Sequence, residues 1–213
     1  MKRYAADVAV LARKDLTLEI RARDTLPAML LFVVSALVVF HFALPAHSSD
    51  LAAKGLLWVA IVFTALVGLT RAFVPEREQR LIDGLLLAPC DRSAIWLGKS
   101  VAVLAFLAAA EVVALPAYAA FFSGIGWSTI AAVVLADVGI VAVGTLLAAV
   151  AAVSRARELL LPLLFLPLAI PVVIGGVGAS VVSDPARYLG FLCLYDAVFA
   201  IISWASFEYV VTE

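Results

Sequence analysis

The sequence is poor in charged residues and in the residue types that build metal centres and disulfides. Charged residues make up 15% of the 213 residues, whereas a soluble domain has about 25%. The only cysteines are Cys90 and Cys193, there are two histidines, and no CxxC or CxxCH motif occurs. These shortages argue against a disulfide framework, a structural zinc site and covalent haem attachment.

The sequence is correspondingly rich in hydrophobic residues. They form 65% of the sequence, and the mean hydropathy is +1.13. A chain of this composition cannot hide its apolar side chains in one soluble core and needs lipid as a solvent. The runs long enough to span a membrane are Leu26–Leu44, Leu51–Thr70, Ile95–Phe122, Trp127–Val153, Leu159–Val182 and Tyr188–Val210. We therefore predict an all-α membrane protein whose residues 25–213 form one domain of six transmembrane helices.

The first 24 residues contain six basic residues and no continuous apolar run, so we expect no cleaved signal peptide. Tyr4, Val8, Leu11 and Leu18 recur at helical spacing among the basic residues. This pattern predicts an amphipathic elbow helix that lies in the membrane interface. A solvated basic tail is the alternative.

The distribution of basic residues predicts the orientation. If the N-terminus is cytoplasmic, thirteen of the fifteen lysines and arginines lie on the cytoplasmic side, and only Lys54 and Arg187 lie outside. Cytoplasmic segments carry such an excess. Both termini are therefore predicted to be cytoplasmic.

The fifth apolar run is rich in residues that disturb helices. Pro162, Pro167 and Pro171 each remove a backbone donor, and Gly175 and Gly176 follow them. Such a run is predicted to be buried among other helices. The residues either allow close helix packing or form a hinge.

Gly98, Lys99 and Ser100 resemble the end of a phosphate-binding loop, but the resemblance is superficial. The first glycine of that motif is replaced by Ser93, bulky residues follow it, and no strand precedes it. We therefore predict that the chain is not an enzyme and hydrolyses no ATP. Lys99 is expected to snorkel to the cytoplasmic interface.

The longest connection, at 71–94, has the pattern of a short amphipathic helix. Pro75 fits a first helical turn, acidic residues follow it, and an apolar stretch ends at Pro89. A helix at about 75–88 could bind a soluble partner or lie on lipid alone. The residues predicted to transmit force to the spans are Glu76, Arg77, Glu78, Arg80, Leu81, Asp83 and Leu85.

Two stretches carry a resemblance to a known family. One runs from Leu56-Leu57-Trp58-Val59-Ala60 through the connection, with its Gly-Leu-Leu-Leu-Ala-Pro, to Gly98-Lys99. The other is LLLPLLFLPLAIPVVI at 159–174. The chain resembles type-2 ABC exporter permeases and, more closely, the CcmB or haem exporter protein B family, over nearly its whole length.

The resemblance implies a permease subunit of a cytochrome c maturation transporter in the bacterial inner membrane. It implies a separate CcmA-like subunit that binds ATP and magnesium and pushes on the 75–88 helix, a CcmC-like haem-handling subunit and a small CcmD-like subunit. The process would be haem export or release of a haem-loaded chaperone, so haem would be a substrate and not a resident cofactor. The alternatives are a type-2 permease for a lipid or drug and a membrane scaffold that transports nothing.

Glu111, Asp137 and Asp196 are acidic residues inside predicted spans, where a carboxylate costs about 2.5–3.5 kcal/mol. They could line a polar outward-facing vestibule, or each could act as interhelical glue. His41 and His47, at the outer end of the first span, could offer a haem ligand or be ordinary interfacial side chains.

Overall fold

The computed structural model describes residues 2–45, 49–74, 91–122, 124–154 and 156–212, and all the regular structure in these ranges is helical. The helices are α1 (Lys2–Ala22), α2 (Thr25–Ala43), α3 (Asp50–Arg71), α6 (Arg92–Phe121), α7 (Trp127–Val153), α8 (Arg157–Val181) and α9 (Ala186–Thr212).

All of these helices except α1 are long and apolar enough to cross a membrane. They start and end within a few residues of the six predicted apolar runs. The prediction of six transmembrane helices is therefore confirmed. The physical reason is that a backbone in lipid must satisfy its own hydrogen bonds, and a single apolar run of this length can do so by forming a helix.

The bundle is built around α7. This helix packs against α3, α6, α8 and α9, and 61% of its most apolar stretch is buried inside the protein, compared with 17% for α2 and 22% for α9. The peripheral helices present large apolar side chains outward, among them Phe42 and Ile201. These outer faces are suited to lipid.

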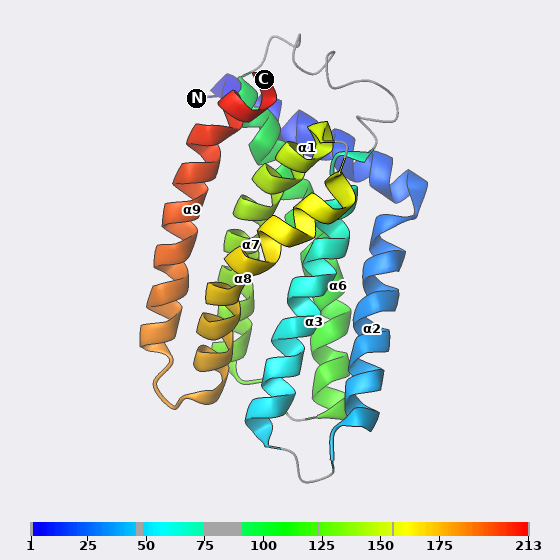
Figure 1. The fold of residues 1–213 in the computed structure, drawn as a ribbon, viewed down its shortest axis with the longest axis vertical. Helices are drawn as coiled ribbons and strands as arrows, with labels where there is room; N and C mark the ends of the chain where they lie inside the picture. Colours follow the sequence, from blue (N-terminus) through cyan, green and yellow to red (C-terminus); the bar gives the residue numbers. More distant parts are fainter. Residues whose placement is uncertain (1, 46–48, 75–90, 123, 155, 213) are drawn as a thin grey trace.

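The predicted N-terminal helix is present and lies across one end of the spans (Figure 1). It packs mainly against the first turns of α6, so the alternative of a solvated tail is wrong. The chain then turns into α2 through Arg23, whose φ of 57° places it in the left-handed region. Such a residue ends a helix abruptly, which lets α1 and α2 meet at a steep angle.

Both termini lie at the end of the bundle that α1 crosses, which is called here the α1 end (Figure 1). The exits of α3 and α7 and the starts of α6 and α8 lie there too. The chain thus returns repeatedly to the α1 end, and basic residues of the described helix ends, such as Arg71, Arg92 and Lys99, lie there.

Candidate functional site at the junction of α1, α3 and α6

The predicted force-transmitting residues lie outside the described residues. They are Glu76, Arg77, Glu78, Arg80, Leu81, Asp83 and Leu85. The structure describes both flanks of their segment, namely the end of α3 with Ala72–Val74 and the start of α6 after Asp91. The anchoring of these flanks determines where any movement of the segment would go.

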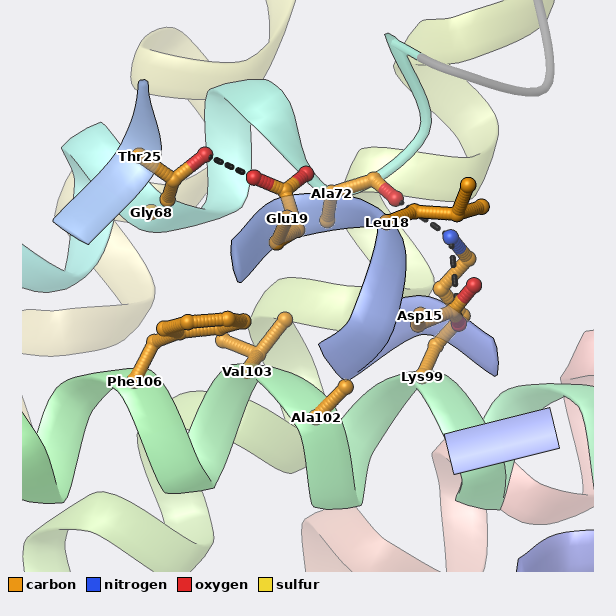
Figure 2. Close-up of a pocket in the computed structure, with 10 residues that line it drawn as sticks. All are labelled: Asp15, Leu18, Glu19, Thr25, Gly68, Ala72, Lys99, Ala102, Val103 and Phe106. Carbon is orange, nitrogen blue, oxygen red and sulfur yellow. Dashed lines mark hydrogen bonds and ion pairs between the residues drawn. The ribbon is translucent and has the colours of Figure 1, made fainter. Parts of the chain in front are cut away.

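Lys99 of α6 fixes the flank that leaves α3. Its Nζ donates a hydrogen bond of 2.7 Å to the carbonyl oxygen of Ala72 and lies 5.1 Å from the centre of the Phe73 ring. The same Nζ lies 3.2 Å from a carboxylate oxygen of Asp15 in α1. Figure 2 shows the ammonium group of Lys99 between the carbonyl of Ala72 and the carboxylate of Asp15. One ammonium group therefore ties together α1, α6 and the exit of α3.

This ion pair is buried. The side chains of Lys99 and Asp15 are 5% and 7% exposed, and the more exposed Lys14 lies 2.9 Å from the other oxygen of Asp15. Removing one partner of a buried pair costs about 3–5 kcal/mol, because the other charge is left without compensation. The expectation that Lys99 snorkels to the interface is wrong, since its charge is satisfied inside the protein.

The flank that enters α6 is anchored to α1 as well. Asp91 caps the helix and accepts hydrogen bonds from the backbone N–H of Ser93 at 3.1 Å and from its hydroxyl at 2.9 Å. The Ser93 hydroxyl also lies 3.1 Å from the hydroxyl of Tyr4 in α1. An aspartate cap of this kind contributes about 1 kcal/mol to stability. The contact with Tyr4 also attaches the capped end of α6 to α1.

The residues beside Lys99 are packing contacts. A Cβ atom on Gly98 would lie 2.8 Å from the Cβ of Leu11, so only glycine lets α1 approach α6 this closely. Ser100 lies 2.9 Å from the hydroxyl of Thr145 in α7. The rejection of a phosphate-binding loop therefore has a structural reason, because each residue of Gly98-Lys99-Ser100 faces a neighbouring helix.

Beside the ion pair lies a small cavity between α1, α3 and α6, with a hydrogen bond from Thr25 to Glu19 in its wall (Figure 2). Its volume of about 20 Å³ is enough for one water molecule, since about 10–15 Å³ is needed for one. A pocket for a small molecule has about 300–1,000 Å³. The cavity at the junction is thus too small to be a substrate site.

The three intramembrane carboxyl groups lie at one depth. Each belongs to a residue ten positions from the end of its helix opposite the α1 end, or about 15 Å at 1.5 Å per residue. Glu111, Asp137 and Asp196 are 6%, 4% and 8% exposed, and one oxygen of each has no hydrogen-bond partner in the described part of the chain. Asp137 interacts electrostatically with both of the others. The structure brings the three together, and their role as a vestibule or as glue stays a prediction.

The glycines of α8 lie where other helices approach closely. A Cβ on Gly176 would overlap the ring of Trp58 in α3, and one on Gly175 would lie 2.8 Å from Leu192 in α9. These close approaches favour the interpretation of helix packing, and whether Gly175 and Gly176 also belong to a hinge stays a prediction.

Pro162 and Pro167 lie in the half of α8 nearer the α1 end, and Pro171 lies just past the middle of the helix. Figure 1 shows the half nearer the α1 end inclined to the rest. Between Pro167 and Pro171, the carbonyl oxygen of Leu168 accepts a hydrogen bond of 2.8 Å from the hydroxyl of Tyr195 in α9. The bend is thus supported from a neighbouring helix. Whether Pro162, Pro167 and Pro171 act as a hinge stays a prediction.

His41 lies in a cluster of aromatic rings, 5.4 Å from Phe121 and 5.7 Å from Phe122 between ring centres, and His47 lies outside the described residues. Within the described ranges, histidine, cysteine and acidic side chains form no group that could hold a metal ion.

Asp15 was not among the residues predicted from the sequence, although the sequence carries a signal for it. Asp15 follows Leu11 by four residues and precedes Leu18 by three, so it lies on the apolar face of α1. An acid on that face needs a partner inside the protein. Its partner lies on a distant part of the chain, and helical periodicity does not identify such a residue.

The chain matches the model of a known protein family. The family model described as CcmB protein matches residues 6–207, which is most of the chain. A search of curated proteins finds no match.

Proposed function

The chain belongs to the CcmB protein family, the non-catalytic permease subunit of the cytochrome c maturation ABC transporter, and on that premise we propose that the 75–90 segment receives force from a separate ATPase subunit. The junction at Lys99 then passes this force to α1, α3 and α6. The chain is a multi-pass membrane protein of a Ccm transporter complex. The ATPase is proposed to be a CcmA-like subunit that binds ATP and magnesium.

The observation that supports this proposal is the anchoring of both flanks of the segment. Ala72, just before it, is held by Lys99, and Ser93, just after it, is held by Tyr4 and capped by Asp91. A load applied between two such anchors cannot be absorbed locally. It moves the attached helices as rigid bodies, which is a known way in which membrane proteins switch state.

We also propose that the α1 end is cytoplasmic. The helix ends described there carry most of the basic residues, whereas Lys54 and Arg187 lie near the starts of α3 and α9 at the opposite end. The positive-inside tendency supports this orientation, and an ATPase that uses cytoplasmic ATP requires it. The membrane is proposed to be the bacterial inner membrane.

We propose that the complex exports haem or drives the release of a haem-loaded chaperone, with CcmC-like and CcmD-like membrane subunits as further partners. The cavity at the junction, with a volume of about 20 Å³, is too small for haem, and the resemblance to the family implies haem as a cargo of the complex. Haem is therefore treated as a substrate of the assembled complex.

Leu85→Asp tests the proposal. A charge placed in an apolar contact is expected to weaken association with the ATPase, so less ATPase should co-purify with the tagged full-length chain. Ala156→Asp is the matched control, because it adds the same charge to the α7–α8 connection at the same end, where Ala156 is exposed. Equal co-purification by Leu85→Asp and the parent would contradict the assignment of the segment.

The same purification tests whether the complex handles haem. An absorbance scan and mass spectrometry of the partners should recover haem with a haem-handling membrane subunit. Recovery of an ATPase without either would instead favour an exporter for another substrate. If charge changes in the segment left ATPase turnover unchanged, a scaffold that transports nothing would be favoured.

A further inference from the structure

A second and much larger cavity lies at the α1 end, between the end of α3, the last turns of α7 and the first turns of α8. Its volume is about 370 Å³, which lies within the range of about 300–1,000 Å³ for small-molecule sites. The described residues that line it are Leu69, Thr70, Arg71, Phe73, Val74, Ala148, Ala151, Ala152 and Leu161.

The cavity has a cause in the sequence. Ala148, Ala151 and Ala152 are spaced so that they share one face of α7, and methyl groups leave that face nearly flat. The opposite wall is the inclined part of α8, whose prolines include Pro162 next to the lining residue Leu161 (Figure 1). Small side chains on one helix and a bend in the other leave space that no described side chain fills.

The walls are apolar apart from the hydroxyl of Thr70 and one cation. Arg71 is the last residue of α3 and is half-buried. No acidic side chain lines the cavity within the described ranges, and no ion pair joins Arg71 to a described carboxylate. Among the described residues, the cavity therefore combines an apolar lining with one cation that has no ion-pair partner there. Arg71 ends a membrane-spanning helix, at the depth where a membrane protein meets lipid headgroups.

We propose that this cavity binds one anionic phospholipid. The phosphate would accept hydrogen bonds from the guanidinium group of Arg71, which suits phosphate geometry, and an acyl chain would occupy the space along Ala148 and Ala151. Basic pockets between transmembrane helices on the cytoplasmic side hold anionic headgroups in this way. The proposed orientation decides only that the lipid comes from the cytoplasmic leaflet; the cavity and its arginine do not depend on it.

The site lies next to the junction. Arg71 and Phe73 line the cavity, and Ala72 between them is held by Lys99. A bound lipid would therefore fill the space behind the exit of α3 and brace it against α7 and α8. The composition of the membrane would in this way influence how firmly the proposed force-receiving segment is anchored.

The test measures lipid selectivity of the full-length chain in its purified complex. The complex is reconstituted in phosphatidylcholine vesicles that contain spin-labelled phosphatidylglycerol or, in a parallel sample, spin-labelled phosphatidylcholine. Electron paramagnetic resonance then gives the immobilised fraction of each label. The parent protein should immobilise phosphatidylglycerol preferentially, and Arg71→Gln should lower this preference about fivefold, because one arginine near the surface contributes roughly that factor. Arg71→Lys should retain most of the preference.

Two further variants separate the cavity from general surface charge. Ala152→Leu should fill the cavity and lower binding of the phosphatidylglycerol label, whereas Ala109→Leu makes the same change on an exposed face of α6 and should not. Arg92→Gln removes a charge at the same end but outside the cavity and should leave the preference unchanged.

An unchanged preference in Arg71→Gln, or an equal loss in Arg92→Gln, would overturn the proposal. Displacement of the label by excess inorganic phosphate alone would also overturn it, since it would show a site for an anion and not for a lipid. Circular dichroism and gel filtration show whether each variant is folded. The assay uses no ATP and no measurement of ATPase association, so its failure leaves the result for Leu85→Asp standing.

Discussion

Replacing Lys99 with methionine removes the charge that joins α1, α3 and α6 while keeping most of the side-chain volume. Asp15 would lose a partner at 3.2 Å and keep only Lys14, which is 34% exposed. The exit of α3 would lose its hydrogen bond to Ala72. Breaking a buried pair from one side costs about 3–5 kcal/mol. Because Lys14 remains, we expect a loss of about 3 kcal/mol in the free energy of unfolding.

The converse change should cost more. Asp15→Leu leaves the buried ammonium group of Lys99 without the carboxylate that faces it at 3.2 Å, so the loss should lie near the upper value of about 5 kcal/mol. The double variant removes both charges. Its loss should be smaller than the sum of the two single losses by about 2 kcal/mol, since neither charge is left alone.

These differences in the free energy of unfolding are measured on the full-length chain in mixed micelles. Circular dichroism follows unfolding as the concentration of the denaturing detergent is increased. Arg92→Gln is the control, because Arg92 and Glu208 are 3.7 Å apart and 37% and 67% exposed, and an exposed pair contributes about 0–1 kcal/mol. If Lys99→Met cost no more than Arg92→Gln, or if the two losses at Asp15 and Lys99 were additive, the junction would not be the connection that we describe.

Three further changes test other parts of the bundle by the same unfolding measurement. Gly176→Ala should cost about 1–3 kcal/mol, because its new methyl group would overlap the ring of Trp58; Gly190→Ala, which has open space, should cost nothing, and equal effects would refute the close approach of α8 and α3. Tyr195→Phe should cost about 1 kcal/mol, because it removes the hydrogen bond to Leu168 in the bend of α8, and no loss would mean that the bend needs no support from α9. Asp137→Asn should stay within about 1 kcal/mol of the parent, since buried carboxyl groups so close together cannot all be charged, and a loss above about 3 kcal/mol would show that the fold requires the charge.

The spans could be predicted from the sequence because lipid imposes a simple rule. A run such as Trp127–Val153 is apolar on all sides, and its length and composition alone indicate a membrane-spanning helix. The start of α2 at Thr25 differs from the predicted Leu26 by one residue, which is within the fraying of a helix end. The equal depth of Glu111, Asp137 and Asp196 could also have been counted from the ends of the predicted runs.

The contacts between helices could not be predicted in this way. Gly176 could be recognised as a residue for close approach, but the sequence does not say that Trp58 fills the space above it. Lys99 was predicted to reach solvent because a lysine near a helix end usually does so. Lys99 is buried because α1 packs across α6 and places Asp15 beside it.

The tripeptide Gly98-Lys99-Ser100 fixes the start of α6 against three other parts of the bundle. Successive residues of an α-helix are about 100° apart around its axis, so three in a row face different neighbours. Gly98 meets α1, Lys99 meets α1 and the exit of α3, and Ser100 meets α7. The start of α6 is therefore held on several sides within one turn. If the proposed force reaches α6 at Asp91, unwinding this turn would require breaking a buried ion pair. The displacement would therefore carry α1 and the end of α3 with it, and through Thr145 it would reach α7, the central helix of the bundle.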